Sequence, residues 1–208
     1  MKISNLEQLQ ELYGEPHPAT AEKKSSTLIK KAIDFIAKSP FIVLSTASGK
    51  GLITSSPKGD APGFVYVQDQ KTLFIPDRPG NKLIDGHKNI IENPNIGLIF
   101  FVPNIRETLR INGKAELRND TELLSRLEAR GKPAFLVTKI TVEESFFHCG
   151  KALIRSNLWN PESWQEPEKI SFGEMLVGGP DNKTKGLIKR ARAKLIDIAI
   201  EKDYKKNL

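Results

Sequence analysis

The chain of 208 residues has a single cysteine, Cys149, and no long run of apolar residues. One cysteine excludes a disulfide within the chain and is typical of a reducing compartment. The longest apolar run, residues 96–102, is far shorter than the about 20 residues that a membrane-spanning helix needs. The first 15 residues are charged and lack the apolar core of an export signal. We therefore predict a cytoplasmic protein without a membrane partner, and we interpret Cys149 as a buried structural residue, with a redox-sensitive thiol as the alternative.

Common nucleotide and metal motifs are also missing. The chain contains neither the glycine-rich fingerprint of dinucleotide-binding folds nor the phosphate loop of nucleoside triphosphatases. The three histidines, His17, His87 and His148, are scattered, and none falls in a spacing that holds a metal ion. These absences exclude the standard nucleotide sites and predict that the protein holds no metal.

The positive charge of the chain is unevenly placed. The formal net charge is +7, and residues 181–208 alone contain nine Lys or Arg against four Asp or Glu. The rest of the chain therefore carries only +2. A nucleic-acid surface needs a basic stripe on the folded body, so we predict no nucleic-acid partner. The alternative is that the C-terminal helix binds DNA.

The hydrophobic pattern predicts an α+β fold around an antiparallel sheet or barrel. The predicted strands cover residues 41–46, 52–55, 64–67, 72–75, 96–102, 106–117 and 134–142. Predicted helices cover residues 26–38, 83–91 and 120–129, and another begins near residue 150. Closely spaced strands with turn signals favour antiparallel pairing over a doubly wound parallel sheet. In the strand 106–117, apolar and polar residues alternate, which predicts one buried and one polar face.

We predict three parts along the chain. Residues 1–25 form an N-terminal helix and linker, and residues 26–170 form the barrel domain. Residues 171–208 form a basic amphipathic helix packed on the domain or on a partner, because its apolar residues fall near one face. These apolar residues are Leu187, Ala191, Leu195, Ile198 and Ala199.

Two clusters have the composition of a phosphate site. The first, residues 55–60, combines Ser55, Ser56 and Lys58 at a strand end. The second places Arg78, Asn81 and Lys82 before a helix. Cations at a helix start oppose the helix dipole unless an anion binds there. Solvated turns are the alternative interpretation of both clusters.

The third cluster follows the last predicted strand. Lys151 and Arg155 are four residues apart on the helix that begins near residue 150, and Trp159 follows them. Residues at this spacing share one helix face. The cluster is interpreted either as two cations and an aromatic aimed at a ligand, or as an amphipathic surface helix anchored by tryptophan.

Three segments together resemble the pyridoxamine 5'-phosphate oxidase-like FMN-binding split-barrel family. They are residues 73–82, 89–94 and 107–117, and the resemblance extends over roughly residues 28–165. It implies a six-stranded antiparallel split β-barrel with flanking helices. It also implies a homodimer with two FMN sites at the interface, each built from both protomers.

The resemblance also implies which residues hold FMN. By position, the phosphate ligands are Ser55, Ser56, Lys58, Arg78, Asn81 and Lys82. Thr108 faces the isoalloxazine ring, and Arg110 follows on the same strand face. The candidates contributed by the partner chain are Lys151, Arg155 and Trp159.

The chain departs from the true oxidases of the family. Those enzymes carry an arginine and a lysine together on the phosphate strand, whereas this chain has Lys58 alone there. Their later Arg-Lys pair is Asn81-Lys82 in this chain. The C-terminus is a basic helix instead of a strand that holds pyridoxine phosphate. We therefore predict an FMN-dependent oxidoreductase of unassigned substrate, without pyridoxamine 5'-phosphate oxidase activity and without a nameable catalytic residue. The alternative is a non-catalytic FMN-binding protein used in storage, electron relay or sensing.

Overall fold

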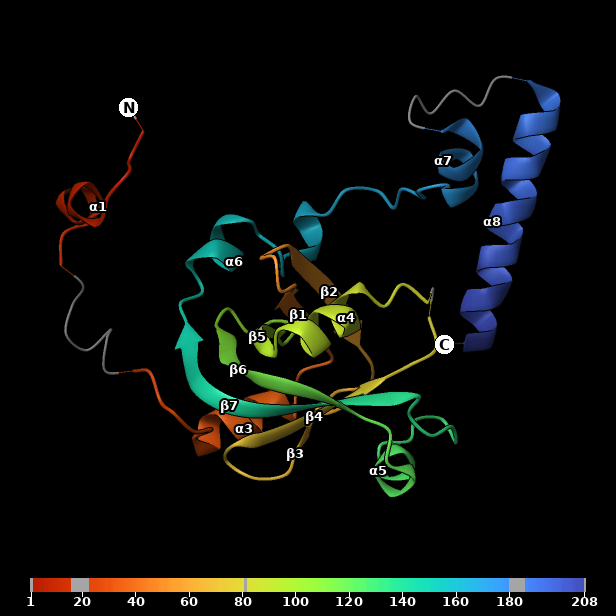
Figure 1. Ribbon diagram of the computed structural model, residues 1–208. Helices are drawn as coiled ribbons and strands as arrows, with labels where there is room; N and C mark the ends of the chain where they lie inside the picture. Colours follow the sequence, from red (N-terminus) through yellow and green to blue (C-terminus); the bar gives the residue numbers. More distant parts are fainter. Residues whose placement is uncertain (1, 16–22, 81, 180–185, 208) are drawn as a thin grey trace. The chain divides into compact units, whose positions relative to one another are not determined.

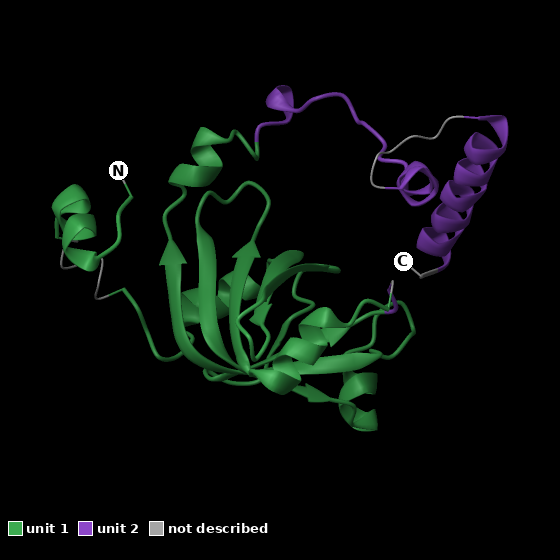
Figure 2. Ribbon diagram, turned by 45° about the horizontal axis from the view of Figure 1, so that its top comes forward, with its two compact units in different colours: residues 1–78, 82–159 green, residues 79–81, 160–208 purple. Residues whose placement is uncertain are grey.

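The computed structural model describes residues 2–15, 23–80, 82–179 and 186–207. The chain divides into two compact units (Figure 2). The first contains residues 1–78 and 82–159, and the second contains residues 79–81 and 160–208. No helix within the described residues is long and apolar enough to cross a membrane.

The first unit is built on one antiparallel sheet of seven strands (Figure 1), in the order β2-β1-β5-β6-β7-β4-β3. The strands are β1 (Phe41–Ala47), β2 (Ile53–Gly59), β3 (Tyr66–Val67), β4 (Thr72–Asp77), β5 (Asn95–Phe101), β6 (Thr108–Arg118) and β7 (Leu136–His148). The antiparallel α+β class is therefore confirmed. The six-stranded barrel is not, because the short β3 pairs with β4 as a seventh strand and no ladder among the described residues joins β2 to β3.

The long pair β6–β7 confirms the alternation seen in the sequence. Leu109 and Ile111 are buried, whereas Arg110 and Asn112 between them are half-buried on the other face. The register shifts at Gly113, where the strands come very close: a Cβ at Gly113 would lie 2.1 Å from the carbonyl oxygen of Thr141. Only glycine fits this approach without moving the backbone.

The hydrophobic core fills the concave side of the curved sheet. Inward residues of β1, β5, β6 and β7 meet the helices α3 (Lys30–Ile36) and α4 (Asp85–Glu92) there. Phe100 and Ile42 are fully buried, and Phe35 of α3 packs edge-on against Phe147 at 5.4 Å between ring centres. Burial of this apolar surface is the main stabilising contribution to the unit.

α3 begins later than the sequence predicts, because the residues before it are held by the sheet. Ser25 and Ser145 exchange two backbone hydrogen bonds of 3.0 and 2.7 Å, and the Leu28 N–H donates to the Gln70 carbonyl at 2.8 Å. The Ser25 carbonyl, which would accept the first hydrogen bond of a helix starting at residue 26, is therefore already occupied. The strap, residues 23–29, is thus tied to β7 at Ser25 and bends at residues 26 and 27.

The described part of the unit also contains the short helices α1 (Leu6–Tyr13), α5 (Thr121–Arg126) and α6 (Lys151–Arg155). α6 begins after Gly150, as predicted. Gly150 is buried against Arg106, where a Cβ would lie 2.6 Å from the arginine Cβ. This close contact fixes α6 at the end of β7.

The second unit contains the turn η1 (Pro161–Ser163) and two helices, α7 (Phe172–Gly178) and α8 (Leu187–Asn207). The helices pack closely, since a Cβ at Gly173 would lie 2.0 Å from the Ala193 carbonyl oxygen. Asp197 of α8 accepts hydrogen bonds from the Ser171 hydroxyl at 2.6 Å and the Gly173 N–H at 2.8 Å. α8 therefore meets α7 through the face that carries Ala193 and Asp197.

The apolar stripe predicted on α8 lies on a different face of the helix. Leu187 and Leu195 are 86% and 67% exposed, whereas Ala193 is buried. α8 thus has two apolar faces, and α7 covers one of them. Burial of the second face on the barrel domain or a partner remains a prediction.

Candidate functional site

Two ion pairs connect strands from opposite parts of the sheet. Lys58 of β2 bonds to Asp77 at the end of β4, and Arg78 donates from Nε to Asp60, just after β2, at 2.9 Å. β2 is one edge of the sheet, and β4 lies one strand from the other edge. The side chains of all four residues are at least three-quarters buried. Two of the predicted phosphate ligands, Lys58 and Arg78, are therefore brought to the same place.

Arg78 is fixed by a second partner. Its guanidinium also donates to the Leu127 carbonyl at 2.9 Å. Burial acts to raise the pKa of the Asp60 carboxyl, but the N–H of Ala61 and the Arg78 guanidinium together hold that pKa below its ordinary value. The Asp60–Arg78 pair is thus charged at neutral pH and joins the end of β4 to the segment after β2.

The first turn of α4 lies over the inner face of β2. A Cβ at Gly86 would be 3.7 Å from the hydroxyls of both Ser56 and Thr46. One turn later, the Asn89 amide donates to Thr46 at 3.1 Å and to Thr54 at 3.2 Å. These bonds explain why the polar side chain of Asn89 is buried. They also hold α4 against β1 and β2, close to Ser56 and Lys58.

The N-terminus of α4 has no side-chain cap among the described residues. Its first backbone N–H groups are therefore available to water or to a ligand. Ser56 offers a hydroxyl and Lys58 an ammonium on the strand below, and the first turn of α4 passes close to Ser56 at Gly86. Uncapped N–H groups, a hydroxyl and a cation are the groups that bind a phosphate monoester.

His87 also lies at this site. Its side chain is 16% exposed, and its Nε2 is 3.7 Å from one Asp77 oxygen, while Lys58 bonds the other oxygen. Burial lowers the pKa of His87 from its ordinary 6.5; Asp77 acts to raise it, and Lys58 lowers it further. Sequence analysis missed His87 and Asp77 as site residues, and no local pattern marks a contact between residues 58, 77 and 87.

The remaining predicted phosphate ligands are placed differently. Ser55 lies on the opposite face of β2 from Ser56 and Lys58, with its hydroxyl 3.0 Å from that of Ser45. Lys82 precedes α4, is exposed and has a left-handed backbone with φ of 60°. Asn81 lies outside the described residues.

The predicted ring contacts lie on the outer face of the sheet. Thr108 and Arg110 flank Leu109 on β6, so they share the face of Ser55 and lie opposite to Lys58. Thr108 is itself buried, and Arg110 is half-buried. Arg110 lies over the ring of Phe146, 5.2 Å from its centre. Lys23 and Lys24 of the strap lie 5.8 and 5.3 Å from the same ring centre. This surface combines an aromatic ring with three cations, of which Lys24 pairs with Glu144 at 2.8 Å, and it is separate from the Lys58–Asp77 site.

The third cluster lies at the end of β7. Lys151 and Arg155 are exposed on α6, whereas Trp159 is half-buried and donates from its indole nitrogen to the Ile105 carbonyl at 3.0 Å. Trp159 therefore anchors the segment after α6. Cys149, predicted to be buried, is exposed in the turn before α6.

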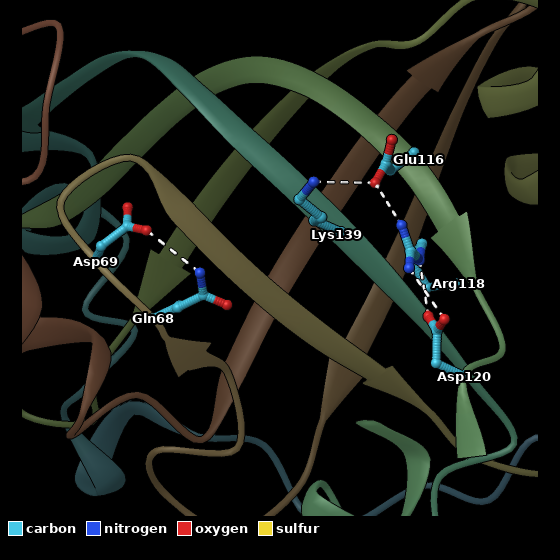
Figure 3. A network of polar contacts seen from close by, with 6 residues as sticks. All are labelled: Gln68, Asp69, Glu116, Arg118, Asp120 and Lys139. Atoms are coloured by element: carbon cyan, nitrogen blue, oxygen red, sulfur yellow. Dashed lines mark hydrogen bonds and ion pairs between the residues drawn. The ribbon is translucent and has the colours of Figure 1, made fainter. Parts of the chain in front are cut away.

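A second polar network covers the outer face of β6 and β7 (Figure 3). Lys139 bonds Glu116 at 3.0 Å, and Arg118 bonds Glu116 at 3.4 Å and Asp120 at 2.7 Å. The hydrogen bond from Lys139 lowers the pKa of Glu116. Two cations here balance two anions at an exposed surface, so the network leaves no excess charge for a ligand.

Comparisons with known proteins agree with the resemblance seen in the sequence. A family model described as pyridoxamine 5'-phosphate oxidase matches residues 28–149. A comparison with curated proteins gives no significant match.

Several solved structures resemble parts of the chain. HupZ of Group A Streptococcus has a TM-score of 0.48 and 20% identity, covering 58% of this chain and 93% of its own. A putative pyridoxamine 5'-phosphate oxidase of Lactobacillus delbrueckii has a TM-score of 0.46 and 20% identity, covering 60% and 98%. An FMN-binding protein of Syntrophomonas wolfei has a TM-score of 0.44 and 8% identity, covering 68% and 95%. Since the family model spans more than half of the sequence, the chain belongs to the pyridoxamine 5'-phosphate oxidase family.

Proposed function

We propose that this protein is an FMN-binding flavoprotein that holds the flavin phosphate where β2, β4 and α4 meet. The observation that carries the proposal is the convergence of Ser56, Lys58 and the uncapped first turn of α4. Membership of the pyridoxamine 5'-phosphate oxidase family supports FMN as the phosphate monoester. The ion pairs Lys58–Asp77 and Arg78–Asp60 support the split-barrel form of the sheet, because they join strands near its two edges.

We propose a homodimer, and the positions of the candidate residues support it. Thr108 and Arg110 lie on the opposite sheet face from Ser56 and Lys58. One protomer therefore does not present both groups to a single flavin, whereas two protomers in a twofold dimer do so reciprocally. We assign the phosphate contacts of each site to one protomer and the ring contacts to its partner.

The outer face of the sheet supports the same arrangement. Phe41 and Ile53 are 42% and 76% exposed, and Phe41 packs against Phe101 at 6.1 Å between ring centres. Apolar side chains gathered on an open sheet face are typical of an interface. A second copy of the chain would cover them.

FMN bound in this way supplies hydride or electron transfer. Arg110 and Thr108 would place a cation and a hydroxyl beside the ring, where a positive group favours the anionic reduced form. The Phe146 ring lies against the Arg110 guanidinium and keeps it on this face. We propose an FMN-dependent oxidoreductase of unassigned substrate, located in the cytoplasm and without a nucleic-acid partner. The alternative is a protein that binds FMN without turnover.

One experiment separates the enzyme from the carrier. The purified protein is loaded with FMN, and the flavin absorbance is followed anaerobically with NADH, NADPH and reduced deazaflavin as donors. Bleaching by one donor, followed by recovery when an acceptor is added, supports the oxidoreductase. Stable absorbance with every donor favours storage or sensing, and no flavin binding at all refutes both functions.

The sharing of each site between protomers has its own test. Lys58→Met and Arg110→Met protomers are each impaired, and their mixture forms heterodimers. If each flavin contacts both protomers, a heterodimer contains one intact site and regains FMN binding. If the mixture binds no better than the single variants, the reciprocal assignment is wrong.

A further inference from the structure

Among the described residues, His87 is the one side chain near Lys58 whose ordinary pKa lies close to neutral pH. It lies in the first turns of α4, next to Gly86, whose Cα faces Ser56. Asp77 lies between Lys58 and His87. One of its carboxylate oxygens bonds Lys58, and the other is 3.7 Å from His87 Nε2. The three side chains are at most 21% exposed. They form a compact cluster, hereafter the Lys58–Asp77–His87 cluster.

The charged groups around this cluster are unevenly distributed. β2 contributes Lys58 and β4 contributes Asp77, whereas Arg78 is engaged by Asp60. On α4 itself, Asp85 and Lys88 are exposed and pair with each other at 3.3 Å. Lys82 precedes the helix and is exposed. Asp77 is therefore the anion that faces His87 most closely.

We propose that His87 is a further residue of this anion site. The His87 imidazole is neutral without a ligand, and it takes up a proton when a phosphate monoester binds. The identification of FMN as this phosphate monoester rests on the proposed function. The existence of the anion site does not depend on that function. The proton comes from the solvent, no covalent bond forms or breaks, and the phosphate keeps its charge. His87 then offers the phosphate a charged N–H donor in addition to Lys58.

The physical reason is the balance of charge around the imidazole. In the empty site, Lys58 and Asp77 largely cancel, and burial favours the neutral ring. A phosphate dianion adds negative charge beside Lys58 and draws that ammonium away from Asp77. Both changes favour an imidazolium, so binding raises the affinity of His87 for its proton.

This coupling fixes the pH dependence of binding. The pKa of His87 lies below 6.5 in the empty protein, and a bound anion raises it. Between these two values the complex holds more protons than the free protein, so anion affinity rises as pH falls. One fully coupled proton changes the affinity by about tenfold per pH unit.

The test uses sulfate as the first probe, because sulfate itself does not titrate near neutral pH. NMR titration of the imidazole C–H resonances follows the three histidines with and without sulfate, and then with FMN. His87→Gln assigns the resonance. We expect sulfate and FMN each to raise the pKa of His87, and the wild-type sulfate affinity to increase between pH 7.5 and pH 6. His87→Gln should lose most of that increase while keeping its circular dichroism spectrum.

Lys88→Gln is the matched control, because Lys88 is a cation on the same helix that pairs outward with Asp85. It should keep the pH dependence of the wild type. If neither sulfate nor FMN moves the His87 titration, or if His87→Gln keeps the full pH dependence, the inference is wrong. If sulfate moves the titration but FMN does not bind, the anion site stands and the proposed flavin function fails.

Discussion

The Asp60–Arg78 pair offers the sharpest test of how the curved sheet is held. The pair joins the segment after β2 to the segment after β4, and no ladder among the described residues pairs those strands. If the contact stabilises the fold, replacing Asp60 and Arg78 singly and together by Ala must give non-additive changes in the free energy of unfolding.

The structure sets the expected size of this effect. Arg78 makes two N–H···O bonds of 2.9 Å, and the side chains of Arg78 and Asp60 are 25% and 14% exposed. Exposed ion pairs contribute about 0–1 kcal/mol, and breaking a fully buried one costs about 3–5 kcal/mol. For this mostly buried pair we expect each single variant to lose about 2–3 kcal/mol and the coupling energy to be about 1–2 kcal/mol.

The assay is urea unfolding of the FMN-free protein at one fixed protein concentration, since dimerisation would otherwise shift the transition. Lys30→Ala and Asp34→Ala form the control cycle, because that pair is exposed within α3. A coupling energy for Asp60–Arg78 no larger than that of the control pair would refute the view that this contact braces the sheet.

Three further predictions concern packing. Gly113→Ala should destabilise the sheet by about 3 kcal/mol or more in urea unfolding, because its Cβ meets the Thr141 carbonyl; a loss under 1 kcal/mol would contradict the close approach. Asp197→Ala should speed amide hydrogen exchange in α7, because the carboxylate holds Ser171 and Gly173; unchanged exchange there would show that the contact is dispensable. Phe41→Asp should shift the protein from dimer to monomer in sedimentation, and an unchanged dimer would place the interface elsewhere.

The sheet was largely predictable because its signals are local. Alternation along β6 follows from a period of two, and it places Leu109 and Ile111 inward and Arg110 outward. The same period separates Ser55 from Ser56 in β2. The family resemblance grouped these two serines as phosphate ligands, and the structure places them on opposite faces.

Helix α4 was harder, because its inner face is not purely apolar. Ile84 and Ile91 are apolar residues of the predicted helix, yet they are 49% and 77% exposed. Asn89 is buried in their place because Thr46 and Thr54 bond its amide. A helix of eight residues shows too few turns for its apolar pattern to reveal such a substitution.

The candidate site was only half predictable. Lys58 and Arg78 stand out because cations near strand ends and before a helix need a counter-charge. Their partners Asp77 and Asp60 depend on how the two ends of the sheet approach, which is set by curvature and not by neighbouring residues. His87 joins them for the same reason.

Comparing the affinities for FMN and riboflavin tests most directly whether the phosphate of FMN binds at Lys58. Fluorescence titration of the wild type, Lys58→Met and the control Lys88→Met gives a dissociation constant for each flavin. We predict that the wild type prefers FMN, and that Lys58→Met weakens FMN by about 1.5–3 kcal/mol while leaving riboflavin unchanged. Lys88→Met should behave as the wild type, because Lys88 pairs outward with Asp85. Equal wild-type affinity for FMN and riboflavin would contradict the account.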